Sequence, residues 1–138
     1  MSKRILAVDP GEVNLGIAIS DPTATIASPL TVLQHTSRQA DAQAILELAR
    51  QHEVERIIVG QSLDEKGNPT FQGRRAARLA AALRALGEFP VELWDESFST
   101  RAALQARRQM GVKRAKRRGH LDDLAATVIL QSYLNARG

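Results

Sequence analysis

Two apolar runs near the N-terminus constrain the fold most strongly, because only a short turn separates them. Residues 4–9 (RILAVD) and residues 15–20 (LGIAIS) each have the length and composition of a β-strand. Pro10 and Gly11 begin the connection, and both residue types favour a turn. We therefore predict a β-hairpin at the start of the chain.

The rest of the chain alternates between helical and strand patterns. A third strand is predicted at residues 28–33, and Pro29 favours an edge position for it because proline cannot donate a ladder hydrogen bond. Helices are predicted at about 38–52, 72–86, 100–110 and 120–136, and strands at 56–60 and 91–94. A hairpin followed by alternating helices and strands indicates an α/β fold with a mixed sheet flanked by helices. We expect one domain spanning residues 1–138.

Composition excludes several classes of protein. The 138 residues include no cysteine, which rules out disulfides, thiolate metal sites and cysteine nucleophiles. No apolar stretch approaches the roughly 18 to 20 residues of a membrane helix, and the first residues do not form a signal peptide. We expect a cytoplasmic protein with no membrane association.

The net charge of +4 conceals an uneven distribution. Residues 101–118 contain eight basic residues and no acid, so the rest of the chain has a net charge of −4. The eight are Arg101, Arg107, Arg108, Lys113, Arg114, Lys116, Arg117 and Arg118. Such a segment suits a polyanion, most often nucleic acid, although a solvated loop is the alternative interpretation. Aromatic residues are scarce, so phosphate contacts are expected to outweigh base stacking.

Acidic residues occur where strands end or a helix begins. Asp9 ends the first strand, Asp95 and Glu96 follow the last strand, and Asp122 and Asp123 open the last helix. Sequence-distant strand ends can meet in one crevice of such a sheet. Each acid alone also has a structural interpretation, as a turn former, a helix cap or a partner of the helix dipole. Converging carboxylates would repel one another, and Mg²⁺ or Mn²⁺ would relieve that repulsion.

Periodicity separates some of these acids. The most coherent apolar face of the last helix contains Ala126, Ile129, Leu130 and Tyr133. Asp122 lies within that face, whereas Asp123 falls at its polar edge. Strand alternation places Asp95 and Glu96 on opposite faces without choosing between them. His35, His52 and His120 are scattered and form no metal motif. An acid cluster beside a basic segment is the combination that a metal-dependent phosphodiester hydrolase requires.

Four segments, in order, resemble the motifs of the YqgF/RuvX family, which is related to the Holliday-junction resolvase RuvC. They read LAVDPGEVNLGIAISD, RIIVGQSLDEKGNPT, WDESFST and LDDLAATVILQSYL, and the resemblance runs from about Lys3 to Leu134. It implies the RNase H-like fold, with a five-stranded mixed sheet flanked by helices. Matched by position, it implies that Asp9, Glu96 and Asp122 are the catalytic metal ligands, and so favours Glu96 over Asp95.

The resemblance is incomplete near these acids. Val13, Asn14 and Ser97 stand where members of the family usually have basic or polar residues, and residues 60–62 read GQS in place of the common GLP. The missing charges shift the expected phosphate contacts to other basic residues. These are the eight of residues 101–118, together with Arg74, Arg75 and Arg78.

The resemblance implies a ribonuclease that processes the 5′ end of pre-16S rRNA, with pre-rRNA and ribosomal precursor particles as partners. Cleavage of branched DNA is the alternative, and a resolvase with paired sites would be a homodimer. A non-catalytic nucleic-acid-binding module is a third possibility. The segment DPGEVNLG is also similar to the phosphate-binding start of actin-like ATPases and sugar kinases, but 138 residues leave no room for their second domain. No P-loop motif is present.

Overall fold

The computed structural model describes residues 3–96 and 121–137, with side chains in the last helix described from Leu124 onward. Its elements follow the predicted order closely. They are β1 (Ile5–Pro10), β2 (Asn14–Ser20), β3 (Ala27–Gln34), α1 (Arg38–Gln51), β4 (Arg56–Gln61), α2 (Phe71–Leu86), β5 (Val91–Asp95) and α4 (Leu121–Arg137). The helix predicted at residues 100–110 lies outside the described residues. No helix in the described part is long and apolar enough to cross a membrane.

The described strands form one five-stranded sheet in the order β3-β2-β1-β4-β5. Strands β1, β2 and β3 pair antiparallel, whereas β4 pairs parallel with both β1 and β5. This arrangement confirms the predicted mixed sheet. Pro29 lies in β3 at the edge of the sheet, as its missing N–H predicted.

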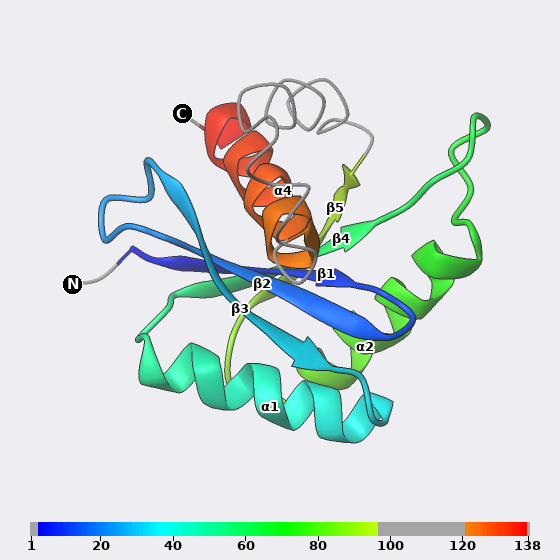
Figure 1. Ribbon diagram of the computed structural model, residues 1–138, viewed down its shortest axis with the longest axis horizontal. Helices are drawn as coiled ribbons and strands as arrows, with labels where there is room; N and C mark the ends of the chain where they lie inside the picture. The colour runs from blue at the N-terminus through cyan, green and yellow to red at the C-terminus, as the bar shows by residue number, and fades with distance from the viewer. Residues whose placement is uncertain (1–2, 97–120, 138) are drawn as a thin grey trace.

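Helices cover both faces of the sheet, with α1 and α2 on one side and α4 on the other (Figure 1). Alternate residues of β1 divide between two cores: Leu6 and Val8 pack with α1 and α2, whereas Ile5 and Ala7 pack against α4. The residues of α4 in the second core include Ala126, Ile129, Leu130 and Tyr133. The predicted apolar face of the last helix is therefore confirmed.

Local sequence explains where the first two helices begin and where α2 ends. Ser37 caps α1, and its side chain accepts the N–H of Ala40. Thr70 caps α2 by accepting the N–H of Gly73 at 3.1 Å. Gly87 ends α2 in the left-handed conformation, with φ of 71°, which favours glycine. Helix α2 therefore begins right after the loop that leaves β4.

Candidate active site

The carboxyl ends of β1, β4 and β5 lie at the same edge of the sheet, because these three strands are parallel and adjacent. Asp9 is the penultimate residue of β1, and Glu96 directly follows β5. Strand β4 separates them and ends at Gly60 and Gln61. The fold therefore brings two predicted ligands, 87 positions apart in the chain, to the two sides of one strand end.

Asp9 belongs to the α4 side of the sheet. Strand alternation places it on the same face as Ile5 and Ala7, both of which pack against α4. Its side chain is half-buried. The following turn is tight, since the N–H of Gly11 donates to the carbonyl of Asn14 at 2.9 Å. A β-carbon on Gly11 would lie 2.6 Å from that carbonyl oxygen, so this turn requires glycine.

Glu96 lies on the same face as Asp9. Its Oε2 is 3.7 Å from the position that a β-carbon on Gly60 would take, and that position is also 2.8 Å from Cδ1 of Ile129 in α4. Trp94, two residues earlier, packs edge-on against Tyr133 of α4 with ring centroids 5.1 Å apart. The structure thus places Glu96 on the α4 side, and alternation along β5 directs Asp95 to the opposite side.

The electrostatics of Glu96 suit a cation. Burial raises the pKa of its carboxyl above the ordinary value, and the neighbouring charge of Asp95 raises it further. A positive charge close to this carboxyl would therefore stabilise its ionised form. Carboxylate oxygens are the ligands that Mg²⁺ and Mn²⁺ prefer, so the donor set of Asp9 and Glu96 fits such an ion.

The direction of α4 places its first turn at the same edge. Ile129 contacts the end of β4 near Gly60, whereas Tyr133, one turn later, lies within 3.2 Å of Arg56 at the start of β4. Helix α4 therefore runs antiparallel to β4, and its first residues lie towards the carboxyl ends of the strands (Figure 1). The backbone of Asp122 belongs to this first turn, while its side chain and that of Asp123 are outside the described part.

The described side chains alone do not form a complete metal site. Among them, no group of three or more histidine, cysteine, aspartate or glutamate residues is arranged to hold a metal ion. Asp9 and Glu96 are two of the three predicted ligands, and a third would have to come from a residue such as Asp122. The eight basic residues of 101–118 and Ser97 also lie outside the described residues.

The three predicted arginines of α2 follow the loop that leaves β4. Arg74 and Arg78 are exposed, and Arg75 is half-buried. Arg74 donates to the carbonyl of Pro69 at 3.3 Å, and its guanidinium lies 5.9 Å from the ring centroid of Phe71. These cations therefore flank the carboxyl edge of the sheet from the side of α1 and α2.

A histidine–aspartate pair was not foreseen from the sequence. His35 Nδ1 lies 2.5 Å from Oδ2 of Asp41, and the Asp41 side chain is only 6% exposed. Sequence reasoning treated His35 as one of three scattered histidines. The available signal was an acid next to the apolar stripe of the first helix, beside Ala42, and it is too weak to name a partner.

Known proteins resemble this chain along nearly its whole length. A family model described as "RuvX: Holliday junction resolvase" matches residues 3–136. A protein of Chloroflexus aurantiacus named "Putative pre-16S rRNA nuclease" is 42% identical over 134 residues, covering 96% of this chain and 87% of the relative. A protein of the same name from Caldanaerobacter subterraneus subsp. tengcongensis is 37% identical, with 97% of each chain covered.

Solved structures show the same fold at low sequence identity. Thermus thermophilus RuvC in complex with a Holliday junction substrate aligns with a TM-score of 0.65 and 20% identity, covering 97% of this chain and 94% of that one. The fowlpox virus resolvase with Holliday junction DNA aligns with a TM-score of 0.60 and 12% identity, covering 97% and 98%. The family model and these relatives together show that the chain belongs to the RuvX family.

Proposed function

We propose that this protein is a divalent-metal-dependent nuclease that hydrolyses phosphodiester bonds at the 5′ end of pre-16S rRNA. The observation that carries this proposal is the position of Asp9 and Glu96, on one face and on either side of the end of β4. The names of relatives at 37–42% identity support the choice of RNA substrate.

Asp9, Glu96 and Asp122 are the residues that would hold Mg²⁺ or Mn²⁺. When bound, such an ion supplies a Lewis acid and lowers the pKa of a coordinated water. The raised pKa of Glu96 supports this assignment, because a bound cation would offset both of its causes, burial and the charge of Asp95. Gly60 contributes by its small size, since a side chain there would fill the space beside Glu96.

The chain's own residues also position the substrate. The turn at Pro10 and Gly11 directs the backbone away from Asp9, which leaves the strand end open to a nucleic-acid backbone. Arg74, Arg75 and Arg78 of α2, together with the basic segment of residues 101–118, are proposed to bind phosphates. Holding the scissile phosphate against fixed carboxylates reduces the entropy lost on reaching the transition state.

A cleavage assay tests this function. Purified protein is incubated with Mg²⁺ or Mn²⁺ and a labelled pre-16S 5′ fragment, a single-stranded RNA or a four-way DNA junction. We expect metal-dependent cutting of the precursor RNA, which Asp9→Asn and Glu96→Gln abolish. Mutation of a residue that only supports a metal ligand typically lowers metal affinity or activity about 10- to 100-fold. Loss of a ligand itself should therefore reduce the cleavage rate by more than about a hundredfold.

Asp95→Asn is the matched control, because Asp95 is the adjacent carboxylate on the opposite face of β5. It should retain most of the cleavage that Glu96→Gln loses. Equal loss in both variants would contradict the assignment of Glu96. Cutting by Asp9→Asn at the wild-type rate would contradict the proposed site as a whole.

Cleavage of branched DNA is the second candidate, because the matching family model is described as a Holliday junction resolvase. Paired, symmetric cuts in the four-way junction, made by a stable dimer, would favour it over the ribonuclease. Binding of nucleic acid without cleavage of any substrate would instead favour the non-catalytic module.

A further inference from the structure

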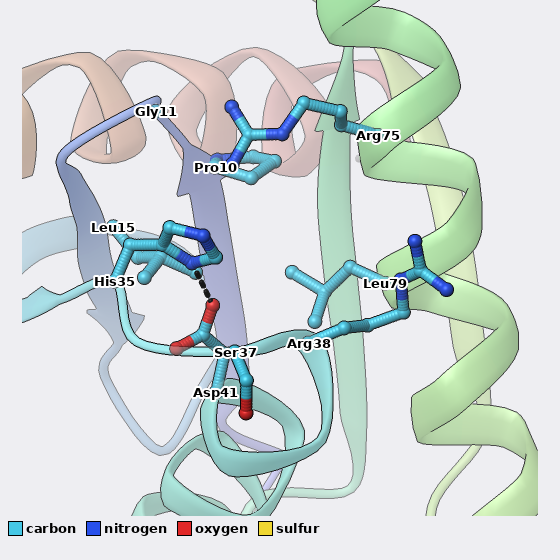
Figure 2. Close-up of a pocket in the computed structure, with 9 residues that line it drawn as sticks. All are labelled: Pro10, Gly11, Leu15, His35, Ser37, Arg38, Asp41, Arg75 and Leu79. Carbon is cyan, nitrogen blue, oxygen red and sulfur yellow. Dashed lines mark hydrogen bonds and ion pairs between the residues drawn. The ribbon is translucent and has the colours of Figure 1, made fainter.

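A pocket with a volume of about 220 Å³ opens at the carboxyl edge of the sheet, on the side of α1 and α2. Its walls come from the turn after β1, the start of α1 and the first half of α2 (Figure 2). Pro10 and Gly11 form part of the lining and directly follow Asp9 in the chain. The pocket therefore lies next to the candidate active site, around the end of β1.

A fixed imidazole lines this pocket. Asp41 is buried and accepts the Nδ1 of His35 at 2.5 Å and the N–H of Thr36 at 3.1 Å. The backbone N–H of His35 donates to the carbonyl of Val13 at 2.8 Å, which fixes the residue at its other side. With Nδ1 directed to Asp41, the Nε2 edge of the ring points towards the guanidinium of Arg75 (Figure 2). In the imidazolium form, Nε2 is a second hydrogen-bond donor.

Two guanidinium groups complete the lining. In Figure 2, Arg75 extends from α2 over Pro10, whereas Arg38 extends from the first residue of α1 towards α2, past Leu79. Neither forms an ion pair with any residue in the described part of the chain. Arg75 has one hydrogen bond, to the neutral side chain of Gln72 at 3.1 Å.

The charge balance of the pocket is positive. Asp41 is the one acid among its lining residues, and His35 engages it. Helix α2 contains four arginines and no acid. The turn after Asp9 holds one acid outside the lining, Glu12, which accepts Nε2 of Gln72 at 3.0 Å. Guanidinium groups without an ion-pair partner in the described part of the chain suit an oxyanion, to which arginine donates in a fixed fork.

We propose that this pocket binds a backbone phosphate of the substrate strand, at a nucleotide beside the one that is cut. The proposal rests on the proposed function, because it assumes that the substrate backbone passes over Asp9. Arg75 donates to the phosphate oxygens, His35 in its imidazolium form, held by Asp41, donates from Nε2, and Arg38 adds positive charge from the start of α1.

The salt dependence of binding tests the pocket directly. The Asp9→Asn protein is used because it should bind the RNA without cutting it. It is titrated with a fluorescent single-stranded RNA of the pre-16S 5′ sequence at several salt concentrations. Arg75→Gln and Arg38→Gln are each introduced into this background. Loss of one phosphate contact should lower the slope of log K against log salt by about 0.7 for a single strand.

Arg50→Gln is the matched control. It removes the same charge from the opposite end of α1, where Arg50 pairs with the exposed Glu88. Such an exposed surface pair contributes little to stability. We expect Arg50→Gln to leave the slope unchanged. Arg75→Gln and Arg38→Gln proteins that behave like Arg50→Gln would overturn the proposal.

Kinetics separate this inference from the proposed function. With Asp9 intact, Arg75→Gln and His35→Gln should raise KM several-fold and leave kcat nearly unchanged, because a phosphate away from the cut is bound equally in ground and transition states. Thermal unfolding checks that each variant is folded. A loss of kcat at unchanged KM would overturn the pocket as a binding subsite. Absence of cleavage by the unmodified protein would count against the nuclease, while the slopes measured with Asp9→Asn would still decide the pocket.

Discussion

Oε2 of Glu96 lies 3.7 Å from the point that a β-carbon on Gly60 would occupy. The same point is 2.8 Å from Cδ1 of Ile129, which is closer than β-carbons approach other atoms in proteins. Gly60 therefore lies where the carboxylate of Glu96, which directly follows β5, approaches the Ile129 side chain of α4. Its lack of a side chain is a packing requirement rather than a need for unusual backbone angles, since its φ is not positive.

Gly60→Ala should destabilise the protein by about 1 kcal/mol, the lower end of the cost of overpacking, because the end of the Ile129 side chain can shift. Ile129→Val removes the atom that clashes and alone should cost about 0.5–1.5 kcal/mol. In the double variant the costs should be less than additive, as measured by urea unfolding. Strict additivity would show that Ile129 does not limit the space at Gly60.

Glu96→Gln should make the metal-free protein more stable at neutral pH. The folded-state pKa of Glu96 is raised above its ordinary value of 4.5, so its contribution to stability is present at low pH and is lost as pH rises through the folded pKa. The variant lacks this titration. Thermal unfolding in EDTA at a series of pH values should therefore show a difference in favour of Glu96→Gln that grows with pH. A lower melting temperature for this variant at neutral pH would contradict the expectation.

Asp21 should stabilise the turn between β2 and β3 in a pH-dependent way. Its carboxylate accepts the N–H groups of Thr25 and Ile26, both at 2.8 Å, and these bonds with those from Thr23 hold its pKa well below the ordinary range. A lowered folded-state pKa means that the contribution is present above the unfolded pKa of about 3.8 and is lost as pH falls through the folded value.

Asp21→Asn removes this charge with little change in shape. Its melting temperature should lie below that of the unmodified protein at neutral pH, and the difference should shrink as the solution is acidified below about pH 4. A difference in melting temperature that stays constant at all pH values would contradict this expectation. It would show that the Asn side chain hydrogen-bonds less well than Asp21 for reasons of geometry and not of charge.

Tyr133→Phe should cost about 1 kcal/mol of unfolding free energy, the usual net value of one hydrogen bond. The hydroxyl of Tyr133 donates to Oε2 of Glu92 at 2.7 Å, and Arg56 donates to both at 3.0 and 3.2 Å. The ring itself, which packs against Trp94, is retained. Chemical denaturation measures the cost. In an Arg56→Gln background the cost should change, because the three polar groups form one network; an unchanged cost would argue against that network.

Local patterns were sufficient for the order of the elements. The period of apolar residues predicted each described helix and strand to within one or two residues, and Pro29 predicted the edge position of β3. The apolar face of α4 was predicted correctly because helical geometry repeats every 3.6 residues. The family followed from four ordered motifs, and the comparisons confirm it.

The side of the sheet on which each acid lies, and the contacts between residues distant in the chain, could be determined only from the tertiary structure. Alternation separated Asp95 from Glu96, but the side that faces α4 follows from the sheet order and from packing of Trp94 on Tyr133. The approach of Glu96 to Gly60 depends on the pairing of β4 with β5. The roles of Asp9, Glu96 and Asp122 as metal ligands stay predictions.

The sequence alone was enough for everything that depends on neighbours along the chain, namely element type, length, edge preference and family. The pairing of His35 with buried Asp41, and the pocket that Arg38 and Arg75 line, depend on how α1 and α2 meet the end of β1. Such contacts join surfaces that carry no shared local pattern. They arise from the register and packing of whole elements, which no short stretch of sequence encodes.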